Sequence, residues 1–336
     1  SGAYPGIPRV TIWSAWNEPN LRSWLGPQRS SSGVPLAPTI YRRLYSAFVA
    51  GLEASGHGRD TLLFGELVPF GSSSRRSPTR ISPLEFLREM FCLDSRYRQY
   101  RGRAAKARGC GRVGRLKTSG IAYHPYVPRG GIYGRLPSRD DAAIAQLSRL
   151  ARTLDGLARR GKLPKRLPIW ITEFGFQTNP PDPYQFPIAR VPGYMDESEW
   201  LAFRNSRVVS YSQYVLLDEA PRASRSRVVR WSGFQQGLRF HDGREKPGVY
   251  LAFRFPVFVR EYARGKVEVF GRTRPQRPGA VVEIAVSSGR SYRVAARTRV
   301  NRYGYFRTTL RVTNATKRKF RIRAAGLTRY KRAVRR

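Results

Sequence analysis

Acidic residues are scarce in this sequence of 336 residues: 22 Asp and Glu face 63 Lys and Arg, a formal net charge of +41. A field of this sign attracts polyanions such as nucleic acid, anionic membrane surfaces and acidic polysaccharides. The basic residues are spread along the whole chain, which favours a compositional preference for arginine with solvated basic faces. No nucleic-acid-binding motif accompanies them, so we expect no dedicated nucleic-acid site. The densest basic run, residues 317–336, could contact an anionic cell-surface polymer.

Cysteine and histidine are also rare, with two Cys and three His in the chain. None of them stands at the spacing of metal ligands, so we expect no metal site. Cys92 and Cys110 flank a short basic stretch and could close it as a disulfide, which forms in oxidising compartments. Two separate buried thiols are the alternative. We favour the disulfide and predict an extracellular, secreted protein.

Long hydrophobic runs are missing as well. No apolar run approaches the ~18–20 residues that a membrane-spanning helix needs, so we expect no transmembrane segment. No signal peptide opens the chain, and we expect it to lie upstream of Ser1. Hydrophobic residues still make up 40% of the sequence, which is enough for a sizeable core.

Segments typical of strands alternate with segments of helical periodicity along most of the chain. The predicted strands cover residues 9–17, 61–68, 120–126, 168–175 and 227–235. The predicted helices cover residues 39–54, 84–91, 139–160, 197–217 and 248–255. This alternation predicts parallel βαβ units and an α/β fold.

The pattern changes near residue 265. Five short alternating segments follow, at residues 267–270, 281–286, 292–299, 305–312 and 319–324, with turn residues between them. We therefore predict two domains, a βα domain over residues 1–260 and a small antiparallel β-sandwich over residues 265–336.

Two glutamates end predicted strands. Glu18 stands in Asn17-Glu18-Pro19 after the first strand, and Glu173 follows Thr172 at the end of the fourth. The alternative for Glu18 alone is an ordinary strand-end turn, and the alternative for Glu173 alone is a buried glutamate in an ion pair. Carboxylates at the carboxyl ends of parallel strands meet at one edge of the sheet, as a pair flanking a glycosidic bond must.

The order of these motifs and their three-strand interval resemble the clan A retaining glycoside hydrolases, with families 39 and 5 the most similar. The resemblance covers about residues 9–255. It implies a (β/α)8 or TIM barrel, Glu18 as general acid/base, Glu173 as nucleophile, and Asn17 as hydrogen-bond donor to the sugar. It also implies an oligo- or polysaccharide substrate and no cofactor.

Two further positions match the same clan. His124 and Tyr126 fit its His-x-Tyr pair, which implies that Tyr126 hydrogen-bonds the nucleophile carboxylate and His124 lines the sugar site. A half-buried histidine and a core tyrosine are the alternative. Trp231 fits the clan's sugar-stacking tryptophan, although its mid-strand position leaves Phe234 or Gln235 as alternatives at the rim.

The sequence also departs from the clan. Barrel strands 1–3 are missing, together with the arginine that the second strand normally supplies, so we expect a partial barrel from strand 4 onward. If Ser1 is the true start, we expect little or no hydrolysis from this chain. The predicted function is a retaining glycoside hydrolase. The alternative is a catalytically inactive carbohydrate-binding or cell-surface protein.

Overall fold

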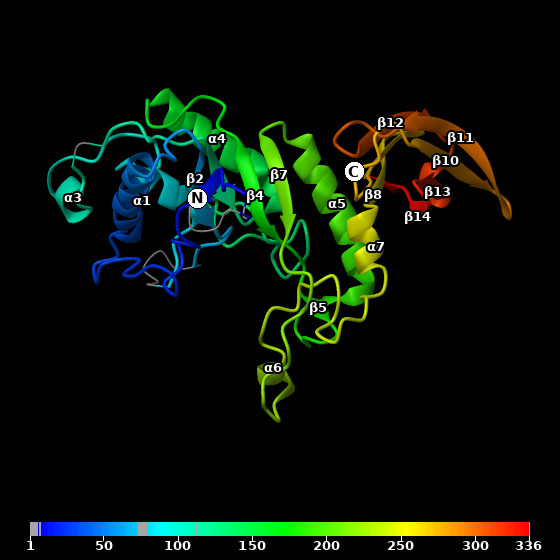
Figure 1. The fold of residues 1–336 in the computed structure, drawn as a ribbon, viewed down its shortest axis with the longest axis horizontal. Helices are drawn as coiled ribbons and strands as arrows, with labels where there is room; N and C mark the ends of the chain where they lie inside the picture. The colour runs from blue at the N-terminus through cyan, green and yellow to red at the C-terminus, as the bar shows by residue number, and fades with distance from the viewer. Residues whose placement is uncertain (1–5, 7, 73–78, 112, 336) are drawn as a thin grey trace. The chain divides into compact units, whose positions relative to one another are not determined.

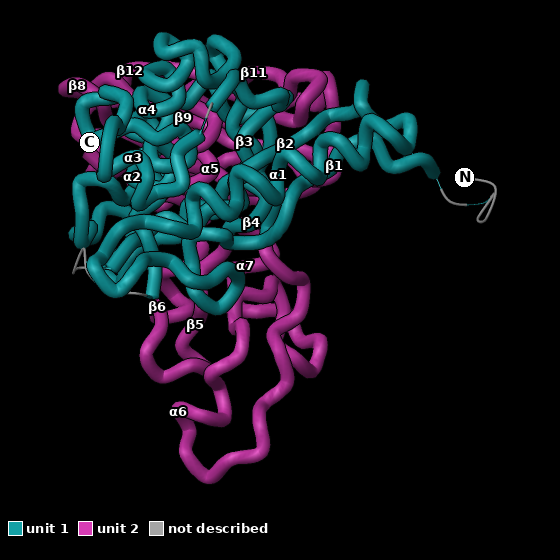
Figure 2. Tube along the Cα trace, turned by 90° about the vertical axis from the view of Figure 1, so that its left-hand side faces the viewer, with its two compact units in different colours: residues 1–174, 205–213 teal, residues 175–204, 214–336 magenta. Residues whose placement is uncertain are grey.

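A computed structural model describes residue 6 and residues 8–72, 79–111 and 113–335. The chain divides into two compact units, which Figure 2 colours separately. The first consists of residues 1–174 and 205–213, and the second of residues 175–204 and 214–336. Within the described ranges, no helix has both the length and the apolar character needed to cross a membrane. The predicted domain boundary between residues 260 and 265 stays a prediction.

A five-stranded parallel sheet forms the centre of the first unit (Figure 1). Its strands follow chain order, β1-β2-β3-β4-β7, and every neighbouring pair is parallel. They are β1 (Ile12–Ser14), β2 (Thr61–Leu67), β3 (Gly120–Tyr123), β4 (Ile169–Phe174) and β7 (Val208–Gln213). Sequential parallel strands joined by helices are the arrangement of half a barrel. The predicted α/β class with a partial barrel is confirmed.

Helices connect these strands: α1 (Ala37–Ala54), α2 (Pro83–Met90), α3 (Gly102–Ala107) and α4 (Leu147–Arg159). The buried Tyr41 hydroxyl fixes α1 to the sheet. It donates to the Ala15 carbonyl (3.0 Å) and accepts from the Gly65 amide (2.7 Å). The helix is thereby anchored beside the carboxyl ends of β1 and β2.

Cys92 and Cys110 form a disulfide across a sequence separation of 18 residues, as the sequence predicts. The bond joins the end of α2 to the chain after α3. It closes a loop in which α3 has no buried side chain. The cross-link therefore holds a segment that contributes little to the core.

Two of the predicted elements are wrong. The predicted helix 197–217 ends early, because α5 (Val191–Arg204) stops before Asn205. The Asn205 side-chain oxygen accepts from the Arg207 amide (3.1 Å) and its carbonyl accepts from the Val208 amide (2.9 Å), a turn that leads into β7. The predicted strand 227–235 is also wrong, since Arg227–Arg230 forms the short helix α6. The fifth strand of the sheet is β7 instead.

The second unit ends in a small β-domain of two four-stranded sheets, ordered β11-β10-β13-β14 and β12-β9-β8-β15. Its strands are β8 (Val257–Ala263), β9 (Lys266–Arg272), β10 (Val281–Ser288), β11 (Ser291–Arg299), β12 (Tyr305–Arg311), β13 (Lys319–Ala324), β14 (Leu327–Arg332) and β15 (Val334–Arg335). Apolar residues from both sheets form one buried cluster. The predicted small β-domain is confirmed, with β8, β14 and β15 in addition to the predicted strands.

The rest of the second unit lies on both sides of α5 in the chain. It contains the short strands β5 (Thr178–Asn179) and β6 (Phe186–Pro187), and the helix α7 (Val249–Arg254). Helix α7 lies within the helix predicted at residues 248–255.

Candidate active site

Four titratable side chains lie at the carboxyl edge of the parallel sheet. Glu18 follows β1, and Glu66 is the penultimate residue of β2. His124 directly follows β3, and Glu173 is the penultimate residue of β4. This edge is where barrel enzymes hold their chemistry. The structure thus brings together the two glutamates and the histidine that the sequence singled out.

The backbone at this edge departs from regular strand geometry. Three non-glycine residues have positive φ angles: Trp16 (67°), Glu18 (42°) and Glu66 (50°). The pairing of β2 with β3 shifts between Gly65 and Leu67, so Glu66 is the extra residue of a bulge. Bulges and left-handed residues re-aim side chains and gather at functional sites. Here they turn glutamates toward His124.

His124 connects the carboxylates. Its ring is buried, with Nδ1 3.0 Å from Glu18 Oε1 and 3.4 Å from Glu173 Oε2. On the other side of the ring, Nε2 lies 2.7 Å from Glu66 Oε2. Carboxylates contact both nitrogens, and ionised carboxylates only accept hydrogen bonds, so this arrangement favours the doubly protonated imidazolium.

These contacts shift the pKa values of the cluster. Burial would lower the pKa of His124, but hydrogen bonds to Glu18 and Glu66 and the negative charge of Glu173 raise it to about 9. Burial would raise the pKa of Glu66, but the hydrogen bond and charge of His124 outweigh burial, so that pKa is lowered. His124 and Glu66 therefore form a buried ion pair.

Glu173 has a second partner in the segment that follows β3. The Tyr126 hydroxyl donates to Glu173 Oε2 at 2.9 Å, the contact that the resemblance implies. The charge of His124 and this hydrogen bond lower the pKa of Glu173, but burial outweighs them and raises it. The Tyr126 ring stacks on Phe174, with centroids 6.3 Å apart and planes at 16°. That packing fixes the direction of the hydroxyl.

Oxygen atoms of Glu18 and Glu173 and a nitrogen of His124 all lie within 4.8 Å of one another. Such a set could in principle ligate a cation. Each ring nitrogen of His124 already faces a carboxylate oxygen, at 3.0 Å and 2.7 Å, however, so a metal would have to replace a hydrogen bond of this cluster. The chemistry of these residues suits an ion-paired cluster better than a metal centre.

Polar and aromatic residues stand close to Glu18 in the chain. The Asn17 side chain is half-buried, and none of the described residues hydrogen-bonds its amide. Trp16 and Trp24 are 50% and 49% exposed, and the Trp16 indole donates to the Trp24 carbonyl at 2.9 Å. Trp13 instead packs edge-on against His57 and donates to Asp60. Exposed indole faces beside a carboxyl group suit the C–H faces of a sugar ring.

Glu66 is a site residue with no sequence motif, and Trp231 lies elsewhere than the sequence predicts. The position of Glu66 directly after Gly65, near the carboxyl end of the predicted strand 61–68, is the one sequence feature that could have indicated a site residue. Thr172 also donates a hydrogen bond to Glu66. Trp231 lies on no strand: it follows α6 in the second unit and contacts the His241 ring at 5.7 Å. The strand placement is wrong, and its role in sugar stacking stays a prediction.

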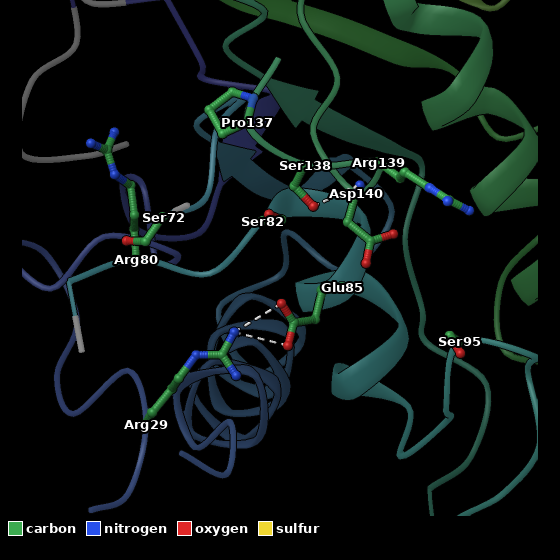
Figure 3. A pocket seen from close by; sticks show the side chains of 10 residues that line it. All are labelled: Arg29, Ser72, Arg80, Ser82, Glu85, Ser95, Pro137, Ser138, Arg139 and Asp140. Atoms are coloured by element: carbon green, nitrogen blue, oxygen red, sulfur yellow. Dashed lines mark hydrogen bonds and ion pairs between the residues drawn. The ribbon is translucent and has the colours of Figure 1, made fainter. Parts of the chain in front are cut away.

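A separate cleft in the first unit has a different lining. It measures about 680 Å³ and is bordered by arginine, serine and acidic side chains, which Figure 3 labels. Arg29 Nη2 donates to both carboxylate oxygens of Glu85, at 2.9 Å to Oε1 and 2.8 Å to Oε2. Asp140 forms an ion pair with Arg88 (2.8 Å). Glu18 and Glu173 do not line it. Its acidic groups are neutralised by arginines, so we do not place the chemistry there.

Comparison with known proteins gives distant structural similarity only. No protein-family model and no curated protein matches the sequence. The structure is similar to an FMN-binding beta-glucuronidase from Facaelibacterium prausnitzii L2-6, with 11% identity and a TM-score of 0.35, over 88% of this chain and 38% of that one. It is also similar to an engineered protein, with 13% identity and a TM-score of 0.29, over 89% of this chain and 60% of that one. The chain thus spans well under half of the glucuronidase.

Proposed function

We propose that the chain is the catalytic part of a retaining glycoside hydrolase that cleaves O-glycosidic bonds in an oligo- or polysaccharide. The carboxyl oxygens of Glu18 and Glu173, at the ends of β1 and β4, approach within 4.8 Å. Retaining enzymes hold their carboxyl groups about 5–5.5 Å apart, whereas inverting enzymes need about 6.5–9.5 Å to admit a water, so an oxygen-to-oxygen approach of this size is nearer to the retaining range. This short separation is the observation that supports the proposal.

The reaction then proceeds by double displacement. A Glu173 oxygen attacks the anomeric carbon while Glu18 gives its proton to the departing glycosidic oxygen, so the leaving group departs as an alcohol. In the second step Glu18, now a carboxylate, takes a proton from water. The water oxygen bonds to the anomeric carbon, and Glu173 departs as a carboxylate.

The neighbouring side chains have positioning roles in this proposal. Tyr126 holds the Glu173 carboxylate by its hydrogen bond, and the charge of His124 opposes the burial that raises the Glu173 pKa, which supports the ionised form that attacks and departs. Glu66 orients His124 through Nε2. Asn17 would donate its amide to a sugar hydroxyl beside Glu18.

The test is hydrolysis of aryl glycosides by the purified full-length protein and by three single variants of it. We expect Glu18→Gln and Glu173→Gln each to lower kcat/KM at least about 1,000-fold, because each removes a step of the mechanism. Glu53→Gln, at an exposed helix position, is the matched control and should leave kcat/KM within about twofold. Proton NMR of the first-formed product should show retained anomeric configuration.

Retained activity in either active-site variant, or an inverted product, would contradict the assignment. A second outcome supports the alternative function: sugar affinity without turnover in the wild-type chain. The open sheet favours this alternative, because β1 and β7 lie at its two edges. Equilibrium binding of the same glycosides, measured beside turnover, separates the two functions.

The disulfide supports an extracellular location for this function, because disulfides persist in oxidising compartments. A polysaccharide-degrading enzyme would meet its substrate there. We therefore propose that the protein is secreted.

A further inference from the structure

One face of the β-domain gathers positive charge. In the sheet β11-β10-β13-β14, alternate residues of each strand point to opposite faces. The inward residues include Val282, Ile284, Phe320 and Ile322, which are all fully buried. The register places the residues between them together on the outer face.

Six cationic side chains occupy that outer face, against a single acid. They are Arg297, Arg299, Lys319, Arg321, Arg323 and Arg332, and we call them the basic face. The acid, Glu283, contacts Arg297 at 3.3 Å and Arg321 at 3.6 Å. Within the described part of the chain, no carboxylate pairs with the other four. Most of the charge on this face is therefore unneutralised.

Two tyrosines lie among these cations. The rings of Tyr292 and Tyr330 are 5.9 Å apart, and the Arg321 guanidinium lies 5.1 Å from the centre of the Tyr292 ring. Tyr330 is 59% exposed. The face therefore combines unpaired charge with an accessible aromatic surface.

We propose that the basic face binds an anionic glycan, a polysaccharide that carries carboxylate or sulfate groups. Outward residues recur about every 6.6–6.8 Å along a strand and about 4.8 Å between strands, so regularly spaced anions can contact several cations at once. The exposed tyrosine suits a sugar ring. The choice of a glycan over nucleic acid rests on the proposed function and on the disulfide.

The experiment measures binding of the full chain to heparin and polygalacturonate, with neutral dextran and single-stranded DNA as comparators. The test variant is the triple replacement Lys319→Gln, Arg323→Gln and Arg332→Gln. We expect its affinity for heparin to fall about tenfold or more, because three exposed ion pairs are lost. Added salt should weaken wild-type binding by screening.

The control variant removes the same number of charges from the first unit, by Arg101→Gln, Arg103→Gln and Lys106→Gln in and beside α3. It should change heparin affinity less than about twofold. Equal losses in the two triple variants would overturn the proposal, because attraction would then come from the charge of the whole chain. Tighter binding of DNA than of heparin would overturn the choice of ligand. If the Glu173→Gln variant binds heparin as tightly as wild type does, glycan binding by the basic face is independent of the proposed catalysis.

Discussion

At the scale of single residues, His124 sets the electrostatics of the candidate site. It is buried among three glutamates, and its ionised form is held by contacts with Glu18, Glu66 and Glu173. Breaking a buried ion pair costs more than breaking an exposed one, because a charge is left without a partner. The protonation state of His124 should therefore be visible in the stability of the chain.

We predict that stability falls as pH rises from about 6.5 to about 9. The pKa of His124 in the folded chain is raised from 6.5 to about 9, so its contribution is complete below the first value and lost above the second. A pKa shift of this size corresponds to a contribution of about 3 kcal/mol to the free energy of unfolding. Urea denaturation across this pH range should show the fall in wild type.

The matched variant for this measurement is His124→Gln, which keeps a polar side chain but does not titrate. Its free energy of unfolding should be nearly flat over the same pH range. Parallel profiles for the two proteins would show that His124 is not held charged.

Gly65 gives a second prediction at this scale. Its φ is +115°, and a Cβ there would lie 2.5 Å from the Ala122 carbonyl oxygen. We expect Gly65→Ala to lower the free energy of unfolding by about 3 kcal/mol, through backbone strain and overpacking. The control Gly51→Ala meets no atom within 4 Å and lies inside α1, so it should be neutral or slightly stabilising. Equal effects of the two would contradict this account.

Individual residues also show what sequence could and could not predict at the site. Glu18, His124, Tyr126 and Glu173 stand in short motifs at strand ends, where parallel pairing brings side chains together. Glu66 carries no such motif. It reaches His124 only because a bulge adds one residue to β2, and single-residue bulges leave no reliable pattern in sequence.

At the scale of elements, segments separated by clear turn residues were predictable, whereas β7, which follows α5 closely, was not. Helix α1 has a clear apolar periodicity and lies where the sequence predicts it. Strand β7 continues the apolar character of α5, and only the turn at Asn205 separates the two. An asparagine after a helix was the available signal, and helical periodicity outweighed it in the prediction.

The disulfide gives the prediction for this scale. The Cys92–Cys110 bond closes a loop of 18 residues around α3, which has no buried side chain. We expect the double variant Cys92→Ala, Cys110→Ala to unfold with a free energy about 3 kcal/mol lower, the effect of closing a loop of that length. Urea denaturation measures it. Wild type under reducing conditions should match the variant, and an unchanged midpoint in both would contradict the prediction.

At the scale of the whole molecule, the net charge of +41 dominates. So large an excess of one sign destabilises the compact state by self-repulsion. We therefore predict that the melting temperature rises by a few degrees between about 0.01 and 0.15 M sodium chloride, as the screening length falls from about 30 to 8 Å.

Differential scanning calorimetry across this salt range is the measurement. The triple variant of the basic face has three fewer positive charges, so its melting temperature should rise less. A melting temperature that falls with salt would mean that attractive surface ion pairs outweigh repulsion in this chain.

The division into compact units has a practical consequence for cloning. Residues 205–213, which follow α5 in the chain, belong to the first unit, whereas α5 itself belongs to the second. A gene fragment that stops at residue 174 would encode the glutamates and the histidine but leave β4 without its neighbour β7. Any single continuous fragment that supplies the entire sheet must therefore also encode the helix that belongs to the other unit.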